Sequence, residues 1–283
     1  MQNYIKQNLY LPVSFKKEEM VKISVPHYRR IKIEPEHPSY EQAGKIFDQS
    51  GFKYPYMPLH LGSFEIADIE KKMKENVLRL MVRKDDENEP IWLPKQLLIF
   101  KDLILEAINY HRQYYEINKN AFIYLTVRSC TYDELFYKNS FSWHIDGFQG
   151  SKIKRHIIEQ NIFWCNKSPT QFLLQPFFCE GLNPSKHDIN DFFDKQANDK
   201  FLINTFKNSL YCVNPYQVHR VNPKKYKGQR VFVRINFSPV VIEDPTNSLN
   251  PVLNDNLIQE HRDVRDFLRG YCINEQKGSG FKF

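Results

Sequence analysis

The stretch YQVHRVNPKKYKGQRVFVRINFS, residues 216–238, joins a histidine, a basic turn and an alternating pattern of apolar and polar residues. The alternation predicts a β-strand, on which successive side chains point to opposite faces. One face would be apolar, with Val231, Val233, Ile235 and Phe237. The other face would carry Arg230, Phe232, Arg234 and Asn236. We expect the apolar face to pack against supporting helices.

The two arginines on the opposite face need an explanation. A guanidinium group that points into a barrel without an anionic partner costs free energy. A carboxylate that accepts two parallel hydrogen bonds is its natural partner. Alternatively, Arg230 and Arg234 form the solvated face of an edge strand. The strand pattern alone leaves both interpretations open.

A second motif lies earlier, in SWHIDGFQG, residues 142–150. On a strand, His144 and Asp146 would project from the same face, so both could reach one metal ion. His219, at the end of a later predicted strand, could supply a third ligand. Two histidines and one carboxylate with open positions form the facial triad of non-haem Fe(II) oxygenases. Taken singly, each of these residues could instead be structural, for example His219 as a hydrogen-bonded core histidine.

A further His-x-Asp pair, His261 and Asp263, provides an internal control. It falls in a predicted amphipathic helix, 254–271, where residues two apart point in different directions. No histidine follows it. We interpret His261 as a residue of the helix surface and not as a metal ligand.

Composition limits the function classes. The 283 residues are enough for one sizeable core. With 41% hydrophobic and 26% charged residues, the sequence is typical of a soluble globular protein. No segment approaches the roughly 20 apolar residues of a membrane helix, and no secretory signal is apparent. The five cysteines form no C-x-x-C pair, which favours a reducing, cytoplasmic setting.

The order of predicted elements indicates an α+β fold. Two helices are expected first, over 63–84 and 94–118. Short β-rich runs separated by turn formers follow, and their spacing indicates a sandwich, barrel or jelly roll. We expect these strands within 121–130, 140–146, 156–165, 170–178, 207–215, 217–221 and 229–238.

We divide the chain into an N-terminal extension of strands and helices that packs on the barrel (1–120), a β-rich core (121–245) and a C-terminal helix with a loose tail (246–283). A polar helical insert, 185–200, interrupts the core and could act as a lid or a substrate platform.

Taken together, these residues resemble the Fe(II)/2-oxoglutarate-dependent oxygenase superfamily over about 121–240. The resemblance implies a double-stranded β-helix, that is, a jelly-roll or cupin-like barrel with supporting N-terminal helices and a C-terminal helix. It also implies that His144, Asp146 and His219 bind Fe(II). The context WHIDGFQG is similar to that of uncharacterised phage-type and bacterial members.

The arginines carry the resemblance further. Arg230, eleven residues after His219, matches the position that holds the C5 carboxylate of 2-oxoglutarate in taurine dioxygenase-like and phytanoyl-CoA hydroxylase-like members. Arg234 matches a second arginine that faces the substrate, and the two roles could be exchanged. Thr170 resembles a threonine whose hydroxyl helps to bind the co-substrate, although it could equally be an ordinary strand residue.

The resemblance therefore implies Fe(II), 2-oxoglutarate and O2, with hydroxylation of an unidentified substrate and release of succinate and CO2. Basic segments, 151–156 and 222–228, adjoin the expected ligands, and the net charge is +7. They suggest an anionic substrate such as nucleic acid, a nucleotide or an acidic peptide, or else they are solvated turns. The sequence names neither the substrate nor the oligomeric state.

Two other functions remain open. A cupin-like metalloenzyme that does not use 2-oxoglutarate would share the barrel and the metal ligands. A non-catalytic β-barrel binding module would share only the barrel. Arg230 and Arg234 favour the dioxygenase over the first alternative, because a dicarboxylate explains them. The complete ligand set argues against the second.

Overall fold

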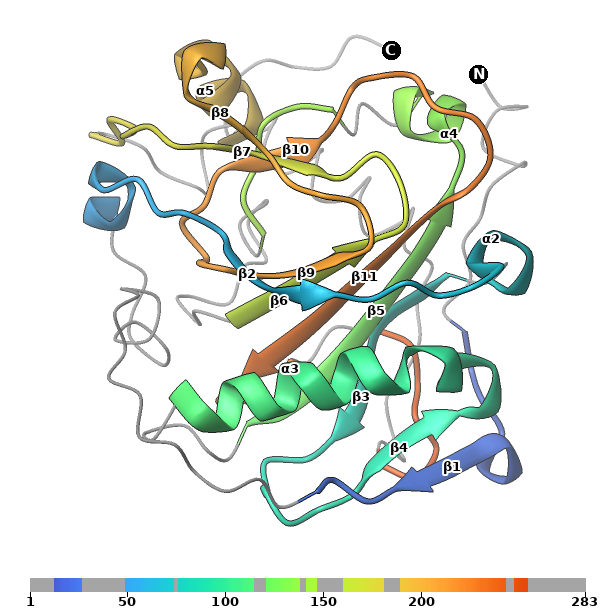
Figure 1. Ribbon diagram of the computed structural model, residues 1–283. Coiled ribbons are helices and arrows are strands. Elements are labelled where there is room, and N and C mark those ends of the chain that lie inside the picture. Colours follow the sequence, from blue (N-terminus) through green and yellow to red (C-terminus); the bar gives the residue numbers. More distant parts are fainter. Residues whose placement is uncertain are drawn as a thin grey trace, which may run out of the picture.

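Figure 1 shows the structure, a computed structural model of the chain. It describes residues 13–26, 49–73, 76–114, 121–137, 141–146, 160–180, 189–242 and 247–253. The predicted C-terminal helix 254–271 and the basic segment 151–156 lie outside the described residues.

The largest element is a six-stranded sheet in the order β2-β9-β6-β11-β5-β3, and every neighbouring pair is antiparallel. A three-stranded antiparallel sheet, in the order β10-β7-β8, lies above it in Figure 1. The strands of the large sheet are β2 (Leu59–Ser63), β9 (Ser209–Val213), β6 (Gln160–Cys165), β11 (Arg230–Ser238), β5 (Phe122–Cys130) and β3 (Val77–Arg83). Those of the small sheet are β10 (His219–Val221), β7 (Thr170–Leu173) and β8 (Leu202–Asn204).

The two sheets share an aromatic core. Phe163 and Phe232 of the large sheet pack in one buried cluster with Phe172 of the small sheet. From β6 onward the chain passes back and forth between the sheets, because β7, β8 and β10 belong to one and β6, β9 and β11 to the other. This mostly antiparallel, two-sheet arrangement is that of a β-sandwich or jelly roll.

The other face of the large sheet is covered by α3 (Lys101–Tyr114), which crosses below the strands in Figure 1. The prediction for β11 is confirmed on this side. Its four apolar side chains are at most 2% exposed and share one cluster with residues of α3 such as Leu103 and Ile104. Burying one such side chain stabilises a fold by about 1.5–3 kcal/mol. The four apolar side chains therefore decide which face of β11 packs against α3. The four residues are Val231, Val233, Ile235 and Phe237.

The remaining elements are short. β1 and β4 form a separate antiparallel pair. Their bounds are β1 (Met20–Ile23) and β4 (Ile91–Pro94). The helices are α2 (Ile69–Lys72), α4 (Tyr132–Tyr137) and α5 (Ile189–Gln196). The 3-10 turns are η2 (Lys17–Glu19), η3 (Gln49–Lys53), η4 (Lys95–Phe100) and η5 (Asp199–Phe201).

The predicted helix over 63–84 is wrong. Ser63 ends β2, only α2 is helical, and β3 begins at Val77. The apolar residues do recur at helical spacing, but β3 pairs with β5 along an irregular register, and both its faces contain buried residues. Sheet pairing and burial override local spacing here. Asp68, the residue before α2, has a left-handed backbone conformation with φ of 55°.

The other helix predictions fare better. Over 94–118 the chain forms η4 and then α3, which is described as far as Tyr114, while residues 115–118 lie outside the described part. The insert 185–200 contains α5 followed by η5. β2 and β3, from the part before residue 121, are strands of the large sheet. The division at residues 120 and 245 stays a prediction.

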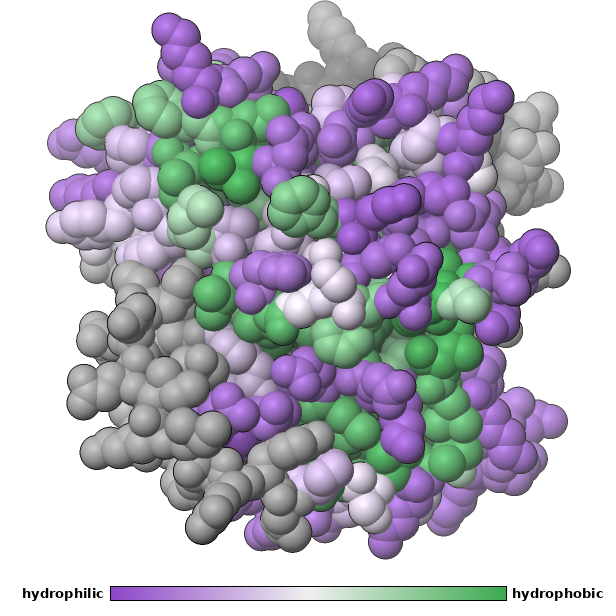
Figure 2. All heavy atoms as spheres, in the orientation of Figure 1, coloured by the Kyte–Doolittle hydropathy of each residue, from purple (hydrophilic) through white to green (hydrophobic). Residues whose placement is uncertain are grey.

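No helix in the described part of the chain has the length and apolarity needed to cross a lipid bilayer. In Figure 2 hydrophilic and hydrophobic residues are mixed over the visible face, with hydrophobic residues gathered at the upper left, over α5. Phe178 and Phe201, both exposed, belong to segments beside this helix.

Candidate metal centre

The three predicted ligands come together in the structure. One ligand atom from each of His144, Asp146 and His219 lies within 4.8 Å of the other two. His219 Nε2 is 3.7 Å from Asp146 Oδ2, and the two imidazole rings are 4.6 Å apart between centroids. Such spacing suits one ion shared by all three side chains.

The two histidines are brought together by the backbone. His144 N–H donates to the His219 carbonyl at 2.9 Å, and His219 N–H donates to the His144 carbonyl at 2.8 Å. The predicted strand over 140–146 is therefore wrong, because His144 forms only an isolated antiparallel bridge. Side chains still alternate there: Trp143 and Ile145 are buried, while His144 and Asp146 turn the other way, toward the centre.

Local hydrogen bonds fix the tautomer of both imidazoles. His144 Nδ1 is 2.8 Å from the carbonyl of Ser142, and His219 Nδ1 is 2.9 Å from the carbonyl of Gln217. Because a carbonyl oxygen only accepts, the proton belongs on Nδ1 in each ring. Nε2 then offers its lone pair to a metal ion.

The protonation states suit metal binding. Burial of the His219 imidazole, together with the nearby His144, lowers the pKa of His219 to about 4. This ring is therefore neutral at neutral pH, as a ligand must be. Burial alone would raise the pKa of Asp146, but the positive charge of Arg234, together with its hydrogen bond to the carboxylate, holds that pKa well below its usual range. The centre presents the neutral imidazole of His219, the imidazole of His144 and the carboxylate of Asp146.

Arg234 orients the carboxylate. Its Nη1 lies 2.6 Å from Asp146 Oδ1, while Asp146 Oδ2 is the oxygen nearer His219. A second group that holds one oxygen of a ligating carboxylate leaves the other directed at the metal. The structure thus places Arg234 behind the carboxylate of a candidate metal ligand.

Arg230 lies on the same face of β11 as Arg234. It is nearer the start of the strand, about 13 Å from Arg234 by the usual rise per residue. Its side chain is buried, with Nε donating to the Ser168 carbonyl at 2.9 Å and the guanidinium carbon 5.0 Å from the centroid of the Phe232 ring. No carboxylate in the described residues forms an ion pair with Arg230. Pairing with an anion offsets the cost of burying a guanidinium.

Thr170 is the first residue of β7 and pairs with Val221 of β10. Phe172, two residues later on β7, pairs with His219. The residue is buried, and its carbonyl accepts a hydrogen bond from the Thr205 hydroxyl at 2.7 Å. Its role as a co-substrate contact stays a prediction.

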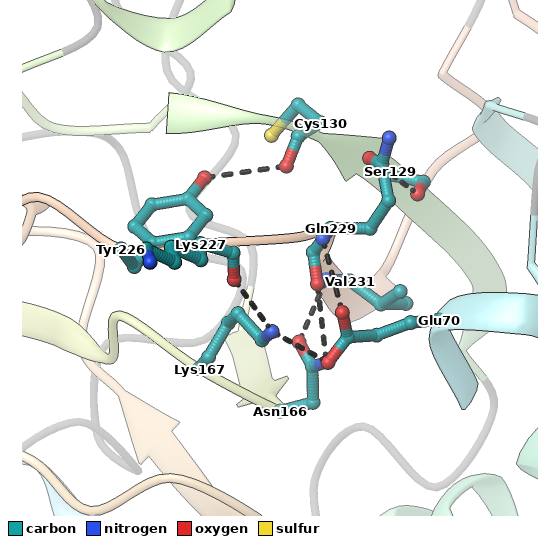
Figure 3. Close-up of polar contacts among 9 residues, drawn as sticks. All are labelled: Glu70, Ser129, Cys130, Asn166, Lys167, Tyr226, Lys227, Gln229 and Val231. Atoms are coloured by element: carbon teal, nitrogen blue, oxygen red, sulfur yellow. Dashed lines mark hydrogen bonds and ion pairs between the residues drawn. The ribbon is translucent and has the colours of Figure 1, made fainter. Parts of the chain in front are cut away.

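Sequence analysis missed a polar network that holds the start of β11 (Figure 3). Glu70 of α2 accepts the main-chain N–H of Gln229 at 3.1 Å and forms an ion pair with Lys167 at 2.5 Å. Asn166 Oδ1 accepts the N–H of Val231 at 2.8 Å, and its Nδ2 donates to the Gln229 carbonyl at 3.3 Å. These bonds flank Arg230 on both sides and fix its backbone.

Gly228 lies against this network and should not tolerate a side chain. Its φ is +81°, and an added Cβ would lie 2.5 Å from Glu70 Oε2. Left-handed backbone costs a non-glycine residue about 1–2 kcal/mol, and Glu70 would have to give up its bonds to make room. Gly228→Ala should therefore lower the free energy of unfolding in urea by about 2 kcal/mol or more.

A double-mutant cycle separates the two causes of this loss. In a Glu70→Ala background the steric contact is gone, so Gly228→Ala should cost only the backbone strain. Equal costs in both backgrounds would show that the Glu70 contact contributes nothing.

Comparisons with known proteins add little to this geometry. No family model matches the sequence, and no curated protein matches it. Among solved structures, EvdMO1 is 12% identical with a TM-score of 0.34, and the match covers 67% of this chain and 48% of that one. HygX from Streptomyces hygroscopicus, solved with nickel and 2-oxoglutarate bound, is 9% identical with a TM-score of 0.33.

The HygX match covers 68% of this chain and 82% of that one. The chain spans about half the length of EvdMO1. At these identities and TM-scores, the likeness assigns neither a family nor a ligand to this chain.

Proposed function

We propose that this protein is an Fe(II)- and 2-oxoglutarate-dependent dioxygenase built on a double-stranded β-helix. The observation that carries the proposal is the convergence of His144, Asp146 and His219 at the end of a two-sheet β fold. Arg230, buried on the strand after His219, supports the choice of co-substrate.

The donor set fits Fe(II). Two imidazole nitrogens and one carboxylate oxygen occupy three positions and leave others for small ligands, which is the pattern of non-haem iron sites. When bound, the iron would supply the oxidising chemistry with O2 and 2-oxoglutarate, which yields succinate and CO2. The protein holds the ligands in place, keeps His219 neutral and fixes the Asp146 carboxylate through Arg234.

Arg230 would bind the far carboxylate of 2-oxoglutarate. A guanidinium matches a carboxylate with two parallel hydrogen bonds, and Arg230 has no acidic partner in the described part of the chain. Arg234 already bonds Asp146, so it orients a metal ligand under this proposal and does not face the substrate.

An anaerobic titration tests the proposal. The protein should bind one Fe(II), and adding 2-oxoglutarate should develop the weak visible charge-transfer band of a chelated 2-oxo acid. Iron binding with no band on addition of 2-oxoglutarate would favour the cupin-like enzyme. Failure to bind iron at all would favour the binding module.

We further propose that the prime substrate is anionic. Lys224, Lys225 and Lys227 are exposed on the loop that joins β10, which carries His219, to β11, which carries both arginines. An exposed cationic loop raises the local concentration of anions and speeds their association. Single-stranded and duplex nucleic acid, nucleotides and acidic peptides are the candidates to screen by succinate release.

Charge reversal at this loop should weaken substrate use. Lys224→Glu together with Lys225→Glu should raise the KM for an anionic substrate by on the order of 10-fold at low salt, and by less at high salt because salt screens exposed charges. The matched control is Lys95→Glu with Lys101→Glu, two exposed lysines of η4 and α3. Turnover of a neutral molecule, unaffected by salt or by the loop variant, would contradict the proposal.

A further inference from the structure

The segment that supplies two of the three metal ligands lies outside any strand. His144 is bonded to β10 by a single two-bond bridge. One such bridge constrains little, yet a metal site requires its ligands to be held within a fraction of an ångström. Other contacts must therefore hold residues 143–146. Besides the ion pair of Asp146 with Arg234, contacts among the described residues come from α5, η5 and Arg220.

The first contact holds the backbone. Asp194 of α5 accepts the main-chain N–H of Trp143 at 2.8 Å through Oδ1. A carboxylate acceptor makes this hydrogen bond charge-assisted and stronger than a bond between neutral groups. The bond fixes the peptide between Ser142 and Trp143, one residue before His144.

The second contact holds the Trp143 side chain. The guanidinium carbon of Arg220, the residue after His219, lies 4.1 Å from the centroid of the Trp143 ring. That guanidinium is itself oriented, with Nε donating to Gln171 Oε1 at 2.9 Å and Nη2 3.7 Å from Asp199 Oδ1 of η5. Trp143, which precedes His144, thus stacks on Arg220, which follows His219.

The third contact is apolar. Trp143 and Ile145 are buried in a small cluster with Phe193 of α5. Phe193 is completely buried, with its ring 5.3 Å from that of Phe52 and 5.1 Å from that of Phe177, measured between centroids. Because side chains alternate along 143–146, anchoring Trp143 and Ile145 to this cluster turns the two ligands toward the centre.

We propose that α5 and η5 support the metal centre, and that Asp194 and Arg220 are positioning residues for the His144–Asp146 ligand pair. The helical insert then acts as a brace for the ligands, in contrast to the lid or substrate platform expected from its sequence. The inference rests on the proposed function only in that it requires a metal ion at His144, Asp146 and His219.

Cobalt titration of the full chain tests this role without turnover. Co(II) bound by the three ligands gives visible d–d bands, so affinity can be measured directly. Asp194→Ala should weaken Co(II) binding by on the order of 10-fold, as loss of an outer-shell partner typically does. Asp194→Asn keeps an acceptor oxygen and should restore most of the affinity. Asp191→Ala, on the same helix and at an exposed residue ion-paired with Lys195, should leave the affinity unchanged.

Arg220→Met provides a second, independent variant. It removes the charge above the Trp143 ring while keeping an apolar cover, and it should also weaken Co(II) binding. Circular dichroism melts ensure that each variant is folded at the temperature of titration. If Asp194→Ala does not fold, Arg220→Met decides the question.

The outcomes separate this inference from the proposed function. A parent protein that binds no Co(II) would overturn the metal centre itself. A parent that binds Co(II), with Asp194→Ala and Arg220→Met binding it equally well, would leave the metal centre standing and overturn the support role. Variants that melt earlier but keep full affinity well below the melting temperature would also overturn it, since they would show a merely structural effect.

Discussion

Replacing His219 with alanine should weaken Fe(II) binding by on the order of 1,000-fold, the largest effect we expect of any single substitution. Tetrahedral protein sites gain about 10–16 kcal/mol from four ligands, so one ligand is worth about 3–4 kcal/mol. His219 is neutral, directs Nε2 at the centre, and bonds directly to His144 through the backbone. Anaerobic Fe(II) titration, with the 2-oxoglutarate band as a second readout, measures the loss.

The matched control is His111, a buried histidine away from the centre. His111 is hydrogen-bonded to Gln160 at 2.6 Å and stacked on Phe237 at 4.0 Å. His111→Ala should lower the free energy of unfolding by about as much as His219→Ala does, but it should leave iron affinity unchanged. If His219→Ala binds iron and forms the band as well as the parent does, the ligand assignment is wrong.

Arg230→Ala should raise the apparent constant for 2-oxoglutarate by on the order of 100-fold, with iron affinity nearly unchanged. A charge-assisted bidentate pair shielded from water is worth about 3 kcal/mol, and Arg230 is 3% exposed. Because Arg230 is remote from the ligands, its loss should act on the co-substrate alone. Steady-state succinate release at saturating iron gives the constant.

Arg234→Ala should show a different signature. Arg234 bonds Asp146 Oδ1, so its removal should change metal binding more than it changes the 2-oxoglutarate constant. Arg230→Lys should lie between the parent and alanine, because an ammonium keeps the charge and loses the fork geometry. If Arg234→Ala instead shows the signature expected of Arg230→Ala, the two roles are exchanged. If neither arginine affects the 2-oxoglutarate constant, the cupin-like alternative gains.

Local patterns predicted β11 well and β3 badly. The alternation along 230–238 gave the correct inner face because that strand lies mid-sheet with one aliphatic side, covered by α3. Residues 77–83 carry apolar side chains on both faces and pair irregularly with β5. Their spacing therefore also fits a helix, and only the pairing partner distinguishes the two.

The sequence by itself determined the types of ligand and which residues could share a face. Side-chain chemistry and a spacing of two suffice to select His144 and Asp146 as a pair, even though they lie off any strand. These are local properties, because side chains alternate along an extended backbone whichever strand it pairs with.

Only the tertiary structure decided which of these side chains converge and what each of them contacts. It brought His219 to His144, put Arg234 against Asp146 and left Arg230 without an acid in the described part of the chain. It also placed Asp194 on a peptide 51 residues away along the chain. A hydrogen bond between residues so far apart in the chain produces no periodic pattern in the sequence. Its geometry is set by the tertiary fold and not by the residues between the two partners.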